Sequence, residues 1–234
     1  MKLGHAFEIT VHVEDLNKAT GFYEKLGFRQ LNGGPATDPA VRLSDGVIVL
    51  AVEPSGQRRS TLTYFTEALD EKISGLEALG IEVARRQAGR EEAVFKDPSG
   101  QEVRLVQASE AAAARTEGSP FSKCGQFGEL SLETDDIEGS KAFWEKLGFG
   151  PTQWSPQASA QWASLTDGLL MLGLYETGHC PHVFESPAIT YFNEDAVERN
   201  QLVKTAGVEF LQELDGGQGV VAAPEGQHLF LFGA

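Results

Sequence analysis

Cysteine is scarce in this sequence, and so are basic residues and long apolar runs. The 234 residues include two cysteines, Cys124 and Cys180. Two thiols do not make the disulfide framework that staples small secreted domains, and disulfides are rare in reducing compartments. The cysteine content therefore predicts a protein of the cytoplasm.

Positive charge is also in short supply. Lysine and arginine number 19 against 34 aspartates and glutamates, which gives a formal net charge of −15 at pH 7. A field of this sign repels phosphate backbones and anionic lipid surfaces. We therefore expect neither a nucleic-acid partner nor a membrane partner.

Long apolar segments are missing as well. No run approaches the roughly 18 apolar residues of a membrane-spanning helix, and residues 1–10 lack the charged and apolar regions of a signal peptide. Hydrophobic residues nevertheless make up 41% of the chain, which is enough to form a core.

One stretch of the chain occurs twice. DLNKATGFYEKLGF begins at Asp15, and DIEGSKAFWEKLGF begins at Asp136, about half a chain later. Each copy predicts a helix, because the aspartate is a good N-cap, and Gly27 or Gly148 allows the left-handed conformation that ends a helix. Apolar residues recur at helical spacing in between, so one face of each helix is expected to be buried. The chain is thus predicted to contain two similar halves.

The segments before these helices alternate in polarity. Alternation predicts a strand with one apolar face for the helix to cover and one polar face. The polar faces carry the side chains of Glu8, Thr10 and His12 in the first copy, and of Glu129, Ser131 and Glu133 in the second.

Further strands and helices repeat in the same order. After the first helix and three short strands, the pattern predicts a strand over 61–66, a helix over 67–79 and strands over 82–87, 93–96 and 102–106. The second half repeats this order, which gives four strand-helix-three-strand units. Residues 109–122 are interpreted as a linker between a domain at 1–108 and a domain at 123–234.

The motifs of this order resemble those of a known superfamily. The alternating strand, the FYEKLGF helix, the apolar strand after Asp45-Gly46 and the closing DPSGQEVRLVQ strand are similar to the vicinal oxygen chelate superfamily, which includes glyoxalases, bleomycin-resistance proteins and extradiol dioxygenases. The resemblance implies an α+β fold of tandem glyoxalase/bleomycin-resistance domains, with two cupped eight-stranded mixed sheets, helices outside and a ligand inside. The halves would form an intrachain pseudo-dimer, and the sequence leaves open a monomer or a homodimer of the whole chain.

Metal-dependent members of this superfamily supply four ligands per cup, usually His and Glu. The resemblance places these positions at Glu8, Val49, Thr61 and Arg104 in the first half, and at Glu129, Met171, Ala188 and Phe230 in the second. A single carboxylate in each half does not hold a divalent ion tightly, so we expect no metal and no other cofactor. Two alternatives stay open, namely Glu8 together with His228, and the segment GHCPHV with His179, Cys180 and His182.

The expected ligand pocket follows from the cup faces. Its candidate residues are Glu8, Thr10, His12, Val49, Thr61, Arg104, Glu129, Ser131, Glu133, Met171, His228 and Phe230. The favoured function is metal-independent binding of a small organic molecule, as in bleomycin-resistance proteins. The alternative is a glyoxalase-type or dioxygenase-type enzyme, with relocated metal ligands or with Glu8 or Glu129 as a general base whose pKa is raised by burial.

Three of these residues also have structural interpretations. Neighbouring Thr, Ser or Arg side chains can satisfy Glu8 and Glu129 without any ligand. Arg104 would pair with Glu129 if the two halves exchange units, and would otherwise hold an anionic ligand. The sequence does not choose between the two cups.

Overall fold

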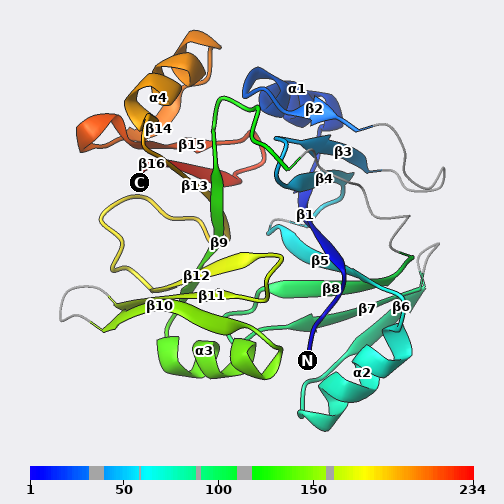
Figure 1. Ribbon diagram of the computed structural model, residues 1–234. Coiled ribbons are helices and arrows are strands. Elements are labelled where there is room, and N and C mark those ends of the chain that lie inside the picture. The colour runs from blue at the N-terminus through cyan, green and yellow to red at the C-terminus, as the bar shows by residue number, and fades with distance from the viewer. Residues whose placement is uncertain (32–39, 58, 88–90, 110–117, 157–160) are drawn as a thin grey trace.

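The computed structural model describes residues 1–31, 40–57, 59–87, 91–109, 118–156 and 161–234. Two eight-stranded mixed sheets form the molecule, and each sheet is built by one half of the chain (Figure 1). The predicted α+β architecture of four strand-helix-three-strand units is confirmed.

The first sheet has the strand order β2-β3-β4-β1-β5-β8-β7-β6. Strands β1 and β5 begin the two units and pair antiparallel at the centre, while β4 and β8 flank them in parallel. The elements are β1 (Ala6–Val13), α1 (Leu16–Lys25), β2 (Arg29–Gln30), β3 (Val41–Ser44), β4 (Val49–Pro54), β5 (Thr61–Thr66), α2 (Leu69–Ala78), β6 (Ala84–Gln87), β7 (Glu91–Lys96) and β8 (Glu102–Gln107).

The second sheet repeats this order as β10-β11-β12-β9-β13-β16-β15-β14. Its elements are β9 (Phe127–Thr134), α3 (Ile137–Lys146), β10 (Gly150–Pro156), β11 (Gln161–Thr166), β12 (Met171–Glu176), β13 (Ala188–Asn193), α4 (Ala196–Thr205), β14 (Phe210–Glu213), β15 (Gly219–Ala222) and β16 (His228–Gly233). A 3₁₀ turn, η2 (Asp215–Gly217), lies between β14 and β15.

The duplicated motif forms α1 and α3, as predicted. Asp15 accepts a hydrogen bond from the backbone N–H of Lys18 at 3.0 Å, and Asp136 accepts one from Gly139 at 2.9 Å. Each helix is followed by a glycine with φ of 94°. The helix predicted over 67–79 is shorter at both ends, which is where helix boundaries fray.

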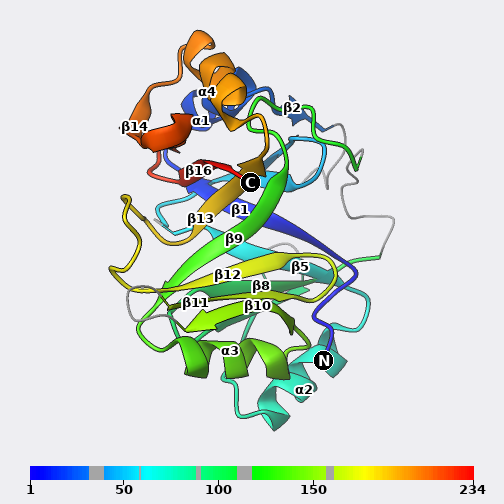
Figure 2. The same cartoon turned by 60° about the vertical axis from the view of Figure 1, so that its left-hand side comes forward.

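The apolar faces of both sheets share one hydrophobic core. It joins Ile9, Leu50 and Tyr23 of the first half to Leu130 and Trp144 of the second. In both views α1 and α4 lie at one end of the molecule and α2 and α3 at the other, so each half contributes one helix to each end (Figures 1 and 2). The alternation of each central strand leaves its polar side chains on the opposite, inner face of the sheet.

Among the described residues, four hydrogen bonds between two side chains join the halves across this core, and each half donates two of them. Aromatic side chains donate and acidic side chains near turns accept. The pairs are Tyr23 with Glu225 at 2.7 Å, Tyr64 with Asp167 at 2.8 Å, Tyr191 with Asp45 at 2.9 Å, and Trp144 with Asp97 at 3.2 Å. The two halves therefore contact each other through two matched pairs of hydrogen bonds.

The alternative in which the halves exchange units is wrong. Arg104 lies in β8 of the first sheet and Glu129 in β9 of the second, so they do not form the ion pair that exchange would create. The predicted domain boundaries stay predictions, and residues 110–117 of the proposed linker lie outside the described residues. Within the described part of the chain, no helix has the length and apolarity needed to cross a membrane.

Candidate functional site

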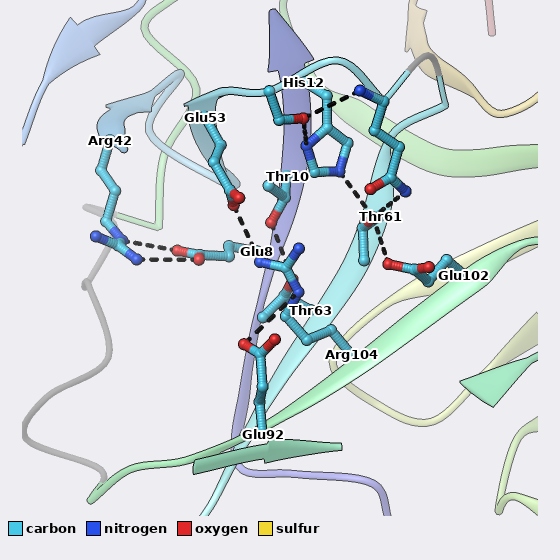
Figure 3. Close-up of polar contacts among 12 residues, drawn as sticks. Glu8, Thr10, His12, Arg42, Glu53, Thr61, Thr63, Glu92, Glu102 and Arg104 are labelled. Carbon is cyan, nitrogen blue, oxygen red and sulfur yellow. Dashed lines mark hydrogen bonds and ion pairs between the residues drawn. The ribbon is translucent and has the colours of Figure 1, made fainter. Parts of the chain in front are cut away.

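The inner face of the first sheet, called here the first cup, is filled by ion pairs. Arg42 in β3 holds both carboxylate oxygens of Glu8, with Nε 2.8 Å from Oε2 and Nη2 3.1 Å from Oε1 (Figure 3). The two side chains are 6% and 1% exposed. A buried bidentate pair of this kind neutralises the carboxylate and fixes its orientation. Glu8 is therefore satisfied by a neighbouring side chain, as the structural interpretation expected.

Arg104 is held by two acidic side chains of the same sheet. Its Nη1 donates to Glu53 at 3.0 Å, and its Nε lies 4.0 Å from a carboxylate oxygen of Glu92. Arg104 is 5% exposed. The guanidinium is therefore already paired with carboxylates of the protein. This pairing disfavours Arg104 as a binding site for an anionic ligand.

The remaining polar residues of the first cup are bonded to one another. Thr10 and Thr63 share a hydrogen bond of 2.9 Å between their hydroxyls. His12 contacts Thr61 through Nε2 at 2.9 Å and Ser55 through Nδ1 at 3.0 Å. Burial lowers the pKa of His12, which keeps the imidazole neutral at pH 7.

The second cup, the inner face of the second sheet, holds a carboxylate of a different kind. Glu129 is 2% exposed, and no arginine takes the place of Arg42, because Ser164 stands at the matching position of β11. Its carboxylate accepts hydrogen bonds from the hydroxyls of Tyr175 at 2.5 Å, Ser131 at 2.9 Å and Ser164 at 3.5 Å. Burial raises the pKa of Glu129, and these hydroxyls offset only part of that rise. The second cup therefore contains a proton-binding group without a cationic partner in its hydrogen bonds.

Gly173 in β12 makes room for this carboxylate. A Cβ atom at Gly173 would clash with Oε1 of Glu129, and the matching residue of the first half is Ala51. The glycine thus allows the side chain of Glu129 to lie flat across the sheet.

An aromatic wall lies beside these polar groups. Phe230 is T-shaped to His182 with ring centroids 4.5 Å apart, T-shaped to Phe184 at 5.0 Å, and stacked on Phe232 at 5.3 Å. His182 and Phe184 come from residues 177–187, which connect β12 to β13 and cover this side of the cup. The wall and the carboxyl group give the second cup an apolar side and a polar side.

The other predicted residues of the second half lie at the edges of its cup. Glu133 accepts a hydrogen bond from the backbone N–H of Gly178 at 3.2 Å, and Met171 is 37% exposed at the start of β12. His228, at the start of β16, accepts one from the N–H of Glu185 through Nδ1 at 3.0 Å. Val49 of the first half is buried at the start of β4.

The donor set of the cups does not fit the metal of metal-dependent relatives. Glu8 is engaged by Arg42, and Val49, Thr61 and Arg104 supply no metal ligand beside it. In the described residues no group of three or more His, Cys, Asp and Glu side chains is placed to hold an ion. His228 belongs to the other sheet from Glu8, which disfavours the proposed pairing of these two residues.

Sequence reasoning missed several residues of both cups. Arg42 gave one usable signal, an arginine between the apolar residues of a predicted strand. Tyr175, Ser164 and Phe184 gave none, because their importance depends on which strands become neighbours.

The structure also brings together one histidine from each half of the chain. His12 of the first half and His228 of the second line one cavity of about 520 Å³ at the junction of the halves. The turn Pro224-Glu225-Gly226 and the N-terminal end of α1 complete its wall.

No family model matches the sequence, and no curated protein matches it either. Solved structures do match over nearly the whole chain. A catechol 2,3-dioxygenase is 17% identical, with a TM-score of 0.65 over 100% of this chain and 89% of that one. A 2,2',3-trihydroxybiphenyl 1,2-dioxygenase from Sphingomonas wittichii is 16% identical, with a TM-score of 0.62 over 99% of this chain and 90% of that one. An extradiol ring-cleaving dioxygenase from B. fuscum is 14% identical, with a TM-score of 0.64 over 98% of this chain and 71% of that one.

These neighbours are extradiol dioxygenases of the vicinal oxygen chelate superfamily. The predicted resemblance is thereby confirmed, and the chain has the tandem vicinal oxygen chelate fold. Identity this low establishes the fold, which in general hosts many chemistries.

Proposed function

We propose that this protein binds a small organic molecule in its second cup without using a metal ion. The observation that carries the proposal is the environment of Glu129, a buried carboxyl group that is hydrogen-bonded only by hydroxyls among the described residues. A ligand site in a protein is typically an apolar enclosure with a few convergent polar groups. Glu129 and Tyr175 supply the polar groups, and Phe230 lies on the apolar side.

The first cup is the weaker candidate because its polar groups already satisfy one another. A ligand there would have to displace the bidentate pair of Glu8 and Arg42, or separate Arg104 from Glu53. Breaking a buried pair costs about 3–5 kcal/mol when one partner is left unpaired. In the second cup a ligand would have to displace the rings of His182 and Phe184 from Phe230, and no buried ion pair of Glu129 has to be broken.

The same geometry suggests the chemical class of the ligand. Phe230 and Phe184 present ring faces and edges, which favour a flat aromatic body. Glu129 favours a hydrogen-bond donor or a cation at the other end of the ligand. The net charge of −15 acts in the same direction and disfavours anions.

A binding series tests this proposal. Phenol, benzylamine and benzoate carry a similar ring with a neutral, cationic or anionic group, and calorimetry gives their Kd values. Benzoate is expected to bind most weakly. Phe230→Ala should weaken phenol and benzylamine by about tenfold or more, because the ring contact is lost.

The variant Glu129→Gln tests the contact with the polar group of the ligand independently of the contact with its ring. It should weaken benzylamine while phenol keeps its affinity, since the amide still accepts a hydrogen bond. Thr10→Val, at the matching position of the first cup to Ser131, is the control and should change neither. Equal effects of Thr10→Val and Phe230→Ala would reject the second cup as the site.

A dioxygenase-type enzyme is the second candidate, and the structural neighbours favour it. All three neighbours described above are named as dioxygenases, and they match this chain over both halves. The residues of the cups argue against it, because neither offers the His and Glu set of metal-dependent relatives. If catalysis occurs without a metal, Glu129 is the better base, since Arg42 engages Glu8.

Two measurements decide between binding and catalysis. Elemental analysis of untagged protein, purified without chelator, gives the metal content, and an oxygen electrode follows consumption with catechol. Stoichiometric metal together with oxygen uptake would replace the binding proposal with the dioxygenase one. Metal-independent turnover of any ligand that collapses in Glu129→Gln, while binding persists, would identify Glu129 as a base.

A further inference from the structure

The connection from β12 to β13, which is the yellow coil between these strands in Figure 1, is attached to the second sheet in an unusual way. Within the described part of the chain, residues 180–186 make no hydrogen bond from one backbone group to another. Side chains of the sheet supply the acceptors for their N–H groups instead. This stretch can therefore move away from the cup without breaking any hydrogen bond between strands.

Two side chains hold the residues on either side of Phe184. Gln212 in β14 accepts a hydrogen bond from the N–H of Val183 through Oε1 at 2.7 Å. His228 in β16 accepts one from the N–H of Glu185 through Nδ1 at 3.0 Å. Phe184 lies between these two attachments, and its ring is part of the aromatic wall of the second cup. The two acceptors therefore position the ring that covers the wall.

The two ends of the stretch have attachments of their own. At the first end, Gly178 has a φ of 75°, and its N–H donates to Oε1 of Glu133 at 3.2 Å. At the other end, the carbonyl oxygen of Pro187 accepts a hydrogen bond from Nε2 of Gln227 at 2.8 Å. Residues 179–186 lie between these points and are called the gate here.

The gate carries a thiol that is close to the acidic groups of the second cup. Cys180 is half-buried. Burial, together with the carboxylates of Glu133 and Glu129, raises the pKa of this thiol to about 11. The other cysteine, Cys124, is 1% exposed and lies in the shared core. The reactivity of Cys180 can therefore report on the position of the gate without any ligand.

We propose that residues 179–186 form a gate over the second cup, and that Gln212 and His228 are positioning residues that hold it closed. This inference rests on the proposed function. A ligand that lies on Phe230 takes the place of the rings of His182 and Phe184, so the gate is open in the bound state. The closed state then competes with the ligand, and the apparent affinity is reduced in proportion to the fraction of open chains.

The variants Gln212→Leu and His228→Leu remove one acceptor each and should raise the open fraction. The Cys180 thiol should then react about threefold faster or more with 5,5′-dithiobis(2-nitrobenzoate), which is followed by the absorbance of the released thiolate. The Kd of phenol, measured by calorimetry on the full chain, should fall in parallel, because the ligand no longer has to break that hydrogen bond. A purely structural role of these side chains would weaken phenol instead.

Conservative variants and controls accompany this pair. His228→Asn should return both readouts towards the parent values, because the amide oxygen can accept in place of Nδ1. Gln201→Leu, at an exposed residue of α4, should change neither readout. Cys180→Ser should remove the thiol signal and leave the buried Cys124 unreactive.

Thermal unfolding shows that each variant is folded, and both leucine variants should melt within a few degrees of the parent chain. The gate is rejected if folded Gln212→Leu and His228→Leu chains keep the parent rate of thiol reaction, or if they bind phenol more weakly than the parent. Faster thiol reaction with no phenol binding in any chain would reject the proposed function and leave the gate in place.

Discussion

The two cups differ through a small number of side chains at matching positions. Arg42 in β3 corresponds to Ser164 in β11, because each lies opposite the same point of the neighbouring strand. Arg104 in β8 corresponds to Phe230 in β16 by the same register. Replacing two arginines by a serine and a phenylalanine removes the cations that hold the carboxylates of the first cup. The second cup is left with a buried acid and an aromatic surface, which are features of a binding site.

The pair of Glu8 and Arg42 provides a stability test at the residue scale. Arg42→Met should lower the free energy of unfolding by about 3–5 kcal/mol, because it leaves a buried carboxylate without its partner. Adding Glu8→Gln to that variant should restore part of the loss. Urea denaturation measures both.

The matched control is Arg85→Met, whose partner Asp70 lies at 2.7 Å but whose side chains are 61% and 85% exposed. Surface pairs contribute about 0–1 kcal/mol. A similar loss in Arg85→Met and Arg42→Met would contradict the assignment of the first cup as a buried ion-pair network.

Glu129 gives a pH dependence with a defined sign. Burial raises its pKa in the folded protein above the ordinary glutamate value of about 4.3. The folded state therefore binds this proton more tightly than the unfolded chain, and ionisation at higher pH destabilises the fold. Relative to Glu129→Gln, the parent chain should lose stability as the pH rises through the folded pKa of Glu129, and should level off above it.

Unfolding free energies of both chains over pH 4 to about 8 measure this difference. If the parent chain instead gained stability relative to Glu129→Gln as the pH rises, the hydroxyls of Tyr175 and Ser131 would outweigh burial and lower the pKa of Glu129. That outcome would also remove Glu129 as a base in the enzyme alternative.

At the scale of elements, α1 and α3 show how local sequence sets local structure. Each begins at an aspartate that accepts a hydrogen bond from the first turn. Each ends where a glycine adopts positive φ. These signals act over a few residues, which is why the duplicated motif predicted both helices without knowledge of the fold.

The caps supply a matched prediction. Asp15→Ala and Asp136→Ala should each lower the free energy of unfolding by about 1 kcal/mol, because an N-terminal backbone donor loses its acceptor. Asp135→Ala, at the exposed neighbouring residue, should cost less than about 0.5 kcal/mol. An equal loss at Asp135 and Asp136 would show that the cap is not what stabilises α3.

At the scale of the whole molecule, the halves share one core and a set of hydrogen bonds across it. Asp45, for example, accepts from the hydroxyl of Tyr191 in the other half, and both groups are buried. A shared core of this kind couples the folding of its parts, so we expect one cooperative unfolding transition.

Two optical probes test this coupling. The three tryptophans all lie in the second half, at Trp144, Trp154 and Trp162, whereas far-ultraviolet circular dichroism reports both halves. The two transitions should coincide in the parent chain. In Tyr191→Phe the two transitions should still coincide, and the free energy of unfolding from each probe should fall by about 1–3 kcal/mol, since Asp45 loses a donor. Separate transitions would show that the halves unfold independently.

The sequence by itself determined the elements and their order. The duplicated helix, its aspartate and glycine signals and the alternating strands are local patterns, and they predicted four repeated units and the polar inner faces that the structure confirms. The polar side chains of the inner faces, such as Glu8 and Glu129, were found for the same reason. A resemblance carried by these motifs also indicated the fold that the solved structures share with this chain.

Only the tertiary structure decided which side chains of the inner faces are paired with one another. Strand neighbours and register place Arg42 beside Glu8 and Tyr175 beside Glu129, and no local pattern in the sequence specifies those pairs. The packing of one half against the other likewise brought His12 and His228 to a single cavity. Secondary structure follows from interactions a few residues apart, whereas the charge and the shape of a site depend on side chains that are distant in sequence and meet only in the folded chain.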